Sequence, residues 1–450
     1  MTGKSRRWVV ALSVYREPRV ITILFLGFAS GLPLALTTST LAIWMARAGV
    51  DRTTIGLFAL VGLPYALKFL WAPFVDRIEL PVLTTWLGRR RGWAVFTQGL
   101  LMATLVALGA SQPDMTPGLT APLAMGVAFC SASQDIVIDA YRIDILADHQ
   151  QGAGAAMTQA GYRLGMLASG AGALFLAEQT SWPVVYGAMA ALMTVGLGAI
   201  LLSPEPRGTA GEEPPPNSNP QPARREAWLP HLVVWIRGAV VAPLADFLQR
   251  PGAGSVLVFI LLYKFGDAFA SVMANPFYVD IGFTNSEIAG ISKVFGLFST
   301  LAGVFIGGVM VSRYGVMFSL LGCGLLQMLS NLMFVVQAMV GHDLGLLAMT
   351  IGFENLAGGM GSAAFVAYLS LLCNMAYSAT QYALLSSLMA VGRTVLSSGA
   401  GWVAEHMDWA AFFVVSTLAA VPGLLLLAWK RRVLDVRLKT RVFPEAEHSA

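Results

Sequence analysis

Acidic side chains interrupt an apolar stretch in the first third of the chain. Residues 130–144 read CSASQDIVIDAYRID and directly follow the apolar run APLAMGVAF. Asp135 and Asp139 are four residues apart, so in a helix they lie on one face, which Ser131 and Arg142 extend. An ionisable side chain inside a membrane is costly and is by default a functional hypothesis.

Two carboxylates on one face of a buried helix repel each other when both are ionised. We therefore expect Asp135 and Asp139 to take up and release a proton. The alternative is that the two aspartates form a static pair with a structural role.

A second charged pair lies in the segment LLYKFGDAFASVMANPFY at residues 261–278. Lys264 and Asp267 are three residues apart and share a helical face. We expect Lys264 to pair with the carboxylates of residues 130–144, so that a proton arriving on an aspartate releases the lysine. Asp267 is expected to take part in the same proton coupling. The alternative is that Lys264 pairs only with Asp267, along its own helix.

A large polar substrate needs a small number of well-placed polar groups and aromatic faces. Glu354 and Asn355 lie beside the glycine cluster of FENLAGGMG, inside another apolar segment. Glu354 can instead pair with Arg163 or Arg393, and aromatic residues are also common at membrane interfaces. The residues that we expect to bind substrate are Ser133, Gln134, Glu354, Asn355, Arg163, Tyr65 and Trp44.

A charged motif follows the second apolar segment. Asp76 and Arg77 end that segment, and the basic cluster GRRRGW follows at residues 88–93. We interpret this region as a structural latch and an orientation signal, rather than as a substrate site. Asp76, Arg77 and Arg142 are the residues that we expect to gate the protein.

The composition is that of a membrane protein. Of the 450 residues, 56% are hydrophobic and only 12% are charged, whereas soluble domains usually contain about 25% charged residues. The three cysteines lie in apolar stretches and lack the CxxC spacing of a metal site. We expect no metal, no cofactor and no nucleic-acid partner. The sequence has no P-loop and no nucleophile–base motif, which argues against an ATP-driven pump and against an enzyme.

Apolar segments that can cross a bilayer recur along the chain, since a spanning helix needs about 20 such residues. We expect twelve spans, at residues 20–44, 54–75, 93–112, 118–141, 153–177, 181–202, 254–279, 286–311, 316–340, 345–373, 379–404 and 409–429. The predicted organisation is a first half at 1–203, a linker at 204–250, a second half at 251–430 and a tail at 431–450. The linker is rich in Pro, Gly and polar residues, and its last part, VVAPLADFLQRPG, is predicted to form an amphipathic helix.

Positive charge is distributed unevenly between the predicted loops. If the N-terminus is cytoplasmic, 22 of the 29 Lys and Arg residues lie in cytoplasmic segments, two lie on the opposite side and five lie inside spans. This is the positive-inside pattern. We therefore expect a multi-pass protein in contact with the lipid bilayer, with both termini in the cytoplasm. Lys68, one of the five inside spans, is expected to extend its amine to the cytoplasmic surface.

Two sets of six helices with a cytoplasmic linker are the layout of the major facilitator superfamily, whose substrate site lies between two similar halves. The fold class that we expect is an all-α membrane protein with 12 transmembrane helices in two six-helix halves. Gly27–Gly31, Gly161–Gly165 and Gly303–Gly307 are predicted to let helices pack closely. These features indicate a secondary transporter, and the aspartates indicate proton coupling.

Several polar segments resemble the AmpG family of muropeptide permeases from Gram-negative bacteria. They include FCSASQDIVIDAYRID, LLYKFGDAFA, FENLAGGMG and SATQYALLSSLMAVGR, and the resemblance extends over about residues 15–430. It implies proton-coupled import of anhydro-muropeptides, which are GlcNAc-anhydroMurNAc with or without a stem peptide, across the bacterial inner membrane. It also implies a role in peptidoglycan recycling and in β-lactam resistance. We expect the protein to be a monomer.

Two other functions fit the residues. The first is a related facilitator for another bulky anion, such as an acyl-CoA or a sugar phosphate, and competition with anhydro-muropeptides would distinguish it. The second is a non-transporting membrane sensor, which would accumulate no substrate in proteoliposomes.

Overall fold

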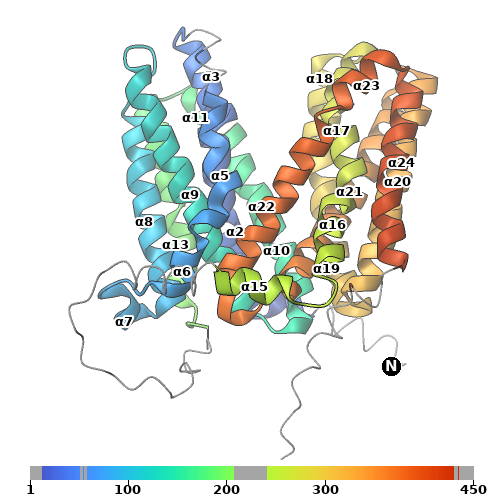
Figure 1. Ribbon diagram of the computed structural model, residues 1–450. Coiled ribbons are helices and arrows are strands. Elements are labelled where there is room, and N and C mark those ends of the chain that lie inside the picture. The colour runs from blue at the N-terminus through green and yellow to red at the C-terminus, as the bar shows by residue number, and fades with distance from the viewer. Residues whose placement is uncertain (1–12, 51–53, 55–57, 207–240, 430–433, 435–450) are drawn as a thin grey trace, which may run out of the picture. The chain divides into compact units, whose positions relative to one another are not determined.

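The computed structural model describes residues 13–50, 54, 58–206, 241–429 and 434. These residues form helices joined by short connections, and no strand occurs among them (Figure 1). The chain divides into two compact units. Unit 1 comprises Met1–Phe247 and Cys373–Ser387, and unit 2 comprises Leu248–Leu372 and Leu388–Ala450. The segment 373–387 therefore groups with the first half of the chain, which the predicted domain boundaries did not include.

The helices of unit 1 follow one another through short turns. They are η1 (Val14–Arg16), α2 (Pro18–Thr37), α3 (Ser39–Arg47), η2 (Phe58–Gly62), α5 (Leu63–Leu67), η3 (Lys68–Leu70), α6 (Ala72–Arg77), α7 (Leu83–Leu87), α8 (Arg89–Gly109), α9 (Pro117–Ile145), η4 (Asp148–Gln150), α10 (Gln151–Leu167), η5 (Ala168–Gly172), α11 (Ala173–Ala177), α12 (Trp182–Leu192), α13 (Thr194–Leu202) and α15 (Ala242–Leu248).

Unit 2 also consists of helices joined by short turns, and one helix is divided between the two units. Its helices are α16 (Ala253–Tyr263), α17 (Phe265–Asp280), α18 (Asn285–Ile288), η7 (Ala289–Phe295), α19 (Gly296–Tyr314), α20 (Val316–Val340), α21 (Leu344–Leu372), α23 (Ala400–His406) and α24 (Trp409–Trp429). The segment 373–387 holds η8 (Met375–Tyr377) and the first half of α22 (Ser378–Ser397), whose second half belongs to unit 2.

Ten helical runs in the described residues are long and apolar enough to cross a membrane. They coincide with ten of the twelve predicted spans. The other two predicted spans are also helical in the described residues. The run at 58–77 is divided into four short helices, two of which begin with a proline in the first turn, Pro64 and Pro73. The run at 151–177 is less apolar because it contains Gln159 and Arg163. The all-α membrane fold is confirmed.

The end of the predicted linker is helical, as expected from VVAPLADFLQRPG. In α15, Pro243 and Phe247 are buried, whereas Leu248 is 57% exposed. The amide of Gln381 donates to the Pro243 carbonyl at 3.1 Å and to the Asp246 carboxylate at 2.7 Å. Residues 207–240 and both chain ends, which carry much of the predicted cytoplasmic charge, lie outside the described residues.

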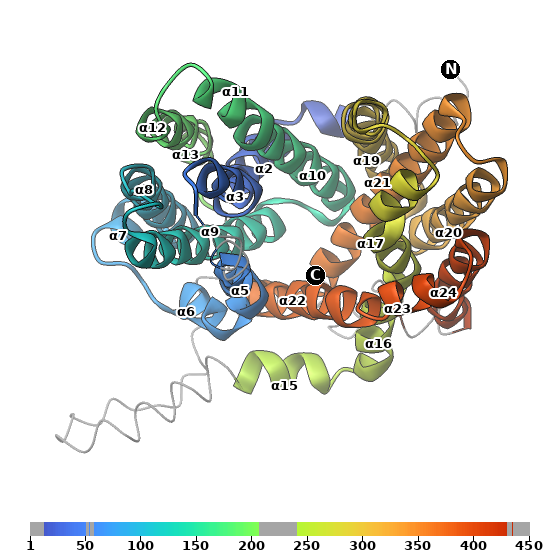
Figure 2. The same cartoon turned by 90° about the horizontal axis from the view of Figure 1, so that it is seen from above.

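Glycines bring α2 and α10 into backbone contact within unit 1, and Figure 2 shows the two helices side by side. A Cβ atom at Gly31 would overlap the carbonyl oxygen of Tyr162, and one at Gly161 would overlap the carbonyl oxygen of Leu24. Such close approach needs residues without a side chain. The predicted packing role of Gly27–Gly31 and Gly161–Gly165 is confirmed.

The same device recurs in unit 2, between α19 and α21. A Cβ atom at Gly303 would overlap the carbonyl oxygen of Leu356, and one at Gly359 would overlap that of Thr300. The predicted packing role of Gly303–Gly307 is therefore confirmed as well, and each unit contains one such close helix pair.

We predict that Gly161→Ala destabilises the protein by about 1–3 kcal/mol, the usual cost of overpacking a close contact. The matched control is Gly99→Ala in α8, where an added Cβ atom meets nothing within 4 Å. Alanine favours a helix interior over glycine by about 1 kcal/mol, so the control should be neutral or stabilising. Thermal unfolding of the purified variants in detergent measures the difference. Equal melting temperatures for the two variants would contradict the packing role.

Candidate functional site

Asp139 is the centre of a charge cluster in unit 1. Its carboxylate lies 3.7 Å from the amine of Lys68 in η3 and 3.3 Å from the guanidinium of Arg142, one turn along α9. Both cations are buried, since Lys68 is 9% exposed and Arg142 is fully buried. The side chain of Asp139 is 17% exposed, so this carboxylate joins two buried cations at the edge of a largely buried cluster.

The position of Lys68 corrects the prediction that this side chain extends to the cytoplasmic surface. Its amine is instead buried against Asp139. The prediction was wrong because snorkelling is the ordinary behaviour of a lysine near the end of a span. The Asp139 carboxylate across the helix interface offers this buried amine an ionic partner at 3.7 Å.

Asp135 lies one turn before Asp139 and has a different neighbour. Its carboxylate accepts a hydrogen bond from the hydroxyl of Ser30 in α2. Within the described residues, both amide atoms of Gln134, nearby on α9, are buried without a hydrogen-bond partner. Orphaned polar atoms are uncommon in folded proteins and often belong to functional sites.

Other predicted substrate residues of unit 1 are packed against protein groups. Ser133 donates to the Phe129 carbonyl at 2.7 Å and accepts from the indole nitrogen of Trp71 at 3.0 Å. Trp44 is 5% exposed, and its ring stacks on that of Trp182 with centroids 5.1 Å apart. Gln134 is fully buried.

Arg163 is placed differently, since its side chain on α10 is exposed. The substrate roles of these residues stay predictions.

In unit 2, Lys264 occupies a break between two helices. It follows the last residue of α16 and precedes the first residue of α17, and Asp267 lies in the first turn of α17. The two charges are 3.5 Å apart. A cation at the end of one helix and an anion at the start of the next both complement the helix dipoles. Helix breaks of this kind are common at transporter binding sites.

A small polar cavity adjoins Asp267. Its lining includes the side chains of Gln327 and Asn331 from α20, which are 5% and 2% exposed. The Nε2 atom of Gln327 has no hydrogen-bond partner in the described residues. The surroundings of Asp267 are therefore polar on the side of α20 as well as on the side of Lys264.

Asn355 links α21 to α19. Its side-chain oxygen accepts from Thr300 at 2.8 Å, and its amide donates to the Ile351 carbonyl at 3.0 Å and to the Glu354 carboxylate at 2.7 Å. The amide group of Asn355 thus has protein partners on both sides. Its predicted contact with substrate stays a prediction, as does that of Glu354.

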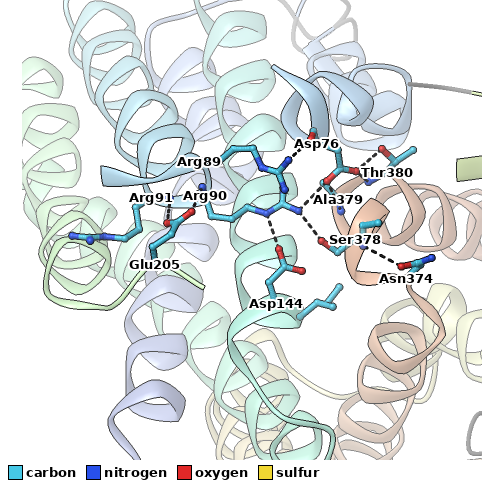
Figure 3. Close-up of polar contacts among 12 residues, drawn as sticks. Asp76, Arg89, Arg90, Arg91, Asp144, Glu205, Asn374, Ser378, Ala379 and Thr380 are labelled. Carbon is cyan, nitrogen blue, oxygen red and sulfur yellow. Dashed lines mark hydrogen bonds and ion pairs between the residues drawn. The ribbon is translucent and has the colours of Figure 1, made fainter. Parts of the chain in front are cut away.

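The predicted latch is a buried ion network in unit 1 (Figure 3). The guanidinium of Arg90 is 2% exposed and lies 2.9 Å from Asp76 and 2.7 Å from Asp144. It also donates to the Ser378 hydroxyl at 2.8 Å. The carboxylate of Asp76 accepts from the backbone of Thr380 at 2.8 Å and from its hydroxyl at 2.7 Å.

Asp76 therefore binds the N-terminus of α22, although it belongs to another helix. The first backbone N–H groups of a helix have no partner within the helix. A carboxylate placed there satisfies these donors and complements the positive end of the helix dipole. Arg77, beside it, is exposed. Arg142 approaches the same helix elsewhere, with its guanidinium 5.1 Å from the ring centroid of Tyr382.

Residues next to this network fix the ends of two helices. Glu205 accepts from the backbone N–H groups of Arg90 and Arg91 at 2.8 and 3.0 Å, at the start of α8. The side chain of Arg91 donates to the carbonyls of Ile200 and Leu201 at 3.1 and 2.7 Å, at the end of α13. Each helix end thus receives the charge that its dipole favours.

Sequence reasoning missed Asp144 and the N-terminal residues of α22. A signal for Asp144 was present, because it lies five residues after Asp139, about 140° away around a helix with 3.6 residues per turn. The third aspartate of the stretch therefore had to face another neighbour. No local signal in the sequence pointed to Thr380 or Ser378 as partners of the Asp76 region.

The comparisons with known proteins agree with this fold. The model of the Major Facilitator Superfamily matches residues 23–270. A crystal structure of a double Trp mutant of XylE is similar, with a TM-score of 0.66 and 12% identity over 94% of this chain and 96% of that chain. At this identity the similarity concerns the fold alone. The helical architecture and the family match define the class, a membrane transporter of the major facilitator type.

Two relatives make the assignment narrower. The chain is 44% identical to the anhydromuropeptide permease of Escherichia coli K12 over 94% of this chain and 82% of that protein. It is 34% identical to a protein named AmpG 4 of Rickettsia felis over 94% of this chain and 99% of that protein. The chain belongs to the AmpG family of the Major Facilitator Superfamily.

We predict that Arg90→Ala destabilises the protein by about 3–5 kcal/mol, because it leaves two buried carboxylates without their cation. Arg47→Ala is the matched control, since Arg47 is exposed at the end of α3. The melting temperature in detergent should fall for Arg90→Ala and stay unchanged for the control. A melting temperature equal to that of Arg47→Ala would show that the network does not stabilise unit 1.

Proposed function

We propose that this protein is a secondary transporter that imports anhydro-muropeptides from the periplasm together with protons. The observation that carries the proposal is the 44% identity, over 94% of the chain, to the E. coli protein named anhydromuropeptide permease. Membership of a transporter family and the absence of a nucleophile–base or P-loop motif in the sequence favour transport over catalysis.

The arrangement around Asp139 supports proton coupling. The carboxylate faces two buried cations in this structure. A proton on Asp139 would remove the negative charge that pairs with Lys68 and Arg142. Both cations would then be more stable beside another anion or water. A ligand or proton changes a conformational equilibrium only through such a difference in interaction between two states.

Asp135 and the second half of the chain complete the proposed cycle. Asp135 has a hydroxyl partner, Ser30, and no ion pair within 4.0 Å among the described residues. Lys264 pairs with Asp267 in this structure. We propose that Lys264 exchanges this partner for a carboxylate of α9 in another state of the cycle. Both aspartates and Lys264 thereby carry the coupling between protonation and movement.

The Asp76 network is the contact through which we propose that protonation is coupled to movement of α22. The residues that it holds, Ser378 and Thr380, begin α22, and α22 continues from unit 1 into unit 2 at Leu388. Release of the helix N-terminus from Asp76 would expose unpaired N–H groups until they gain water or another partner. We propose that this contact forms and breaks once in each transport cycle, with Arg77 and Arg142 assisting.

A muropeptide is bulky, polar and partly anionic, which suits a hydrated site with amides and cations. Arg163 and Lys264 are the cations that we propose for the anionic groups. Gln134 and Asn355 are the proposed amide donors, and Glu354 is proposed to bind substrate or a proton. The proposed location is the bacterial inner membrane, with both termini in the cytoplasm, and the proposed state is a monomer.

The transport prediction concerns purified protein in proteoliposomes. A defined anhydro-muropeptide should accumulate in the lumen when the outside is acidic, and collapse of the pH gradient should abolish accumulation. Competition by an unlabelled anhydro-muropeptide, but not by an acyl-CoA or a sugar phosphate, should block uptake of the labelled one. Uptake that only the latter compounds block would assign the protein to another anion. The absence of any accumulation would favour a membrane sensor.

The coupling prediction concerns Asp139 and its newly found partner. Asp139→Asn and Lys68→Gln should each abolish proton-driven accumulation, while counterflow exchange of labelled for unlabelled substrate stays partly intact. Arg47→Gln is the control for loss of a cation outside the cluster. Normal accumulation by both variants at equal protein content would remove Asp139 from the coupling mechanism and would leave the transport activity itself unaffected.

A further inference from the structure

The segment between α6 and α8 exposes large apolar side chains at one end of unit 1. Val82 is 60% exposed and Trp86 is 84% exposed, and Ile78 is 36% exposed. Leu202, at the end of α13, is 91% exposed. Figures 1 and 2 place α7 at the lower end of unit 1 and on its outer edge. Among the described residues, no neighbour covers these four side chains to the extent expected of a core.

This exposed surface is held in place by specific contacts. The indole nitrogen of Trp93 donates to the Ile78 carbonyl at 2.8 Å, and Leu80 donates to the Thr84 hydroxyl at 2.8 Å. Gly92 allows α7 to lie against α8, since a Cβ atom there would be 3.1 Å from the carbonyl of Leu83. A surface fixed by such contacts has one orientation toward its surroundings.

Val82 has an unusual backbone conformation in this segment. Its φ angle is 67°, and it is the only non-glycine residue with positive φ among the described residues. A β-branched residue is strongly disfavoured there, and strained residues cluster at sites with a function. The turn is followed by α7, which presents Trp86 outward. The strained residue and the exposed Trp86 thus lie in the same short segment.

The depth of the segment follows from the adjoining helices. α8 has 21 residues and is therefore about 30 Å long, close to the hydrocarbon thickness of a bilayer. Residues 78–88 immediately precede its first residue, and Leu202 ends another candidate span. Both therefore lie at the level where a span meets water. Tryptophan is enriched at that level because its ring has an apolar body and one polar atom.

The charge of the segment fits the same surroundings. Arg77 is exposed beside Ile78, and Glu79 is the only acidic residue between positions 77 and 91. Arg89 and Arg91 follow the segment as half-buried cations that donate to backbone carbonyls, and Glu205 binds the backbone N–H groups at 90 and 91. We infer that residues 78–88 and Leu202 form an interfacial anchor that inserts into a leaflet of anionic phospholipid. Exposed apolar side chains beside an exposed arginine are what such a surface binds.

The test uses the full chain in lipid nanodiscs with a nitroxide label. Cys130 and Cys323 are buried and are not expected to react, and Cys373→Ser removes the third cysteine. Trp86→Cys and Val82→Cys carry the label in separate proteins. Leu100→Cys, on an exposed site in the middle of α8, is the hydrocarbon reference. Asp114→Cys, in the exposed turn between α8 and α9, is the aqueous reference.

In nanodiscs with anionic lipid, labels at positions 86 and 82 should be several-fold more accessible to oxygen, relative to a nickel chelate, than the label at 114. Nanodiscs of zwitterionic lipid alone should hold both labels less deeply. Equal depth in the two lipids would overturn the assignment to anionic lipid. Labels as accessible to nickel as the one at 114 would overturn the anchor itself, and this result is expected if a protein partner covers the surface instead.

Discussion

Buried charged side chains need partners, and this need fixes where several helices of the structure meet. Arg90 is the clearest case. A guanidinium with 2% exposure lies between Asp76 and Asp144, and Asp76 binds the start of α22 at the same time. Neither carboxylate is stable in this position without the cation, because desolvation of an unpaired charge costs several kcal/mol. The network thereby determines where α6, α8, α9 and the segment 373–387 meet. It also explains why that segment packs with unit 1, although its sequence position places it in the second half.

A second network, around Asp139, obeys the same constraint with a different result. Asp76 has a full set of donors around it, including backbone N–H groups, which hold it firmly in the state described here. Asp139 has two side-chain cations and no backbone donor among the described residues, and its side chain is 17% exposed. Side chains rearrange more readily than helix ends. This difference separates a contact suited to holding a conformation from one suited to responding to a proton.

The sequence was sufficient for the helices and for some of their contacts. Hydrophobic length located the ten long apolar helices of the described residues, and the small-residue pairs marked helix faces that pack closely, because both signals are local. The partners of the charged residues could not be predicted from the sequence. Lys68 and Asp139 are 71 residues apart, and Asp76 and Thr380 are 304 apart. No periodicity links positions at such distances. The break at Lys264 was also missed, since an apolar run does not show where its helix is interrupted.

In the proposed cycle, substrate and proton move together through protonation of the α9 carboxylates. Proteoliposomes that contain a pH-sensitive dye in the lumen test it directly, with no imposed gradient. Addition of a defined anhydro-muropeptide outside should acidify the lumen as the substrate enters, and Asp139→Asn protein should show no acidification. Entry of the substrate without any change in lumenal pH would contradict the claim.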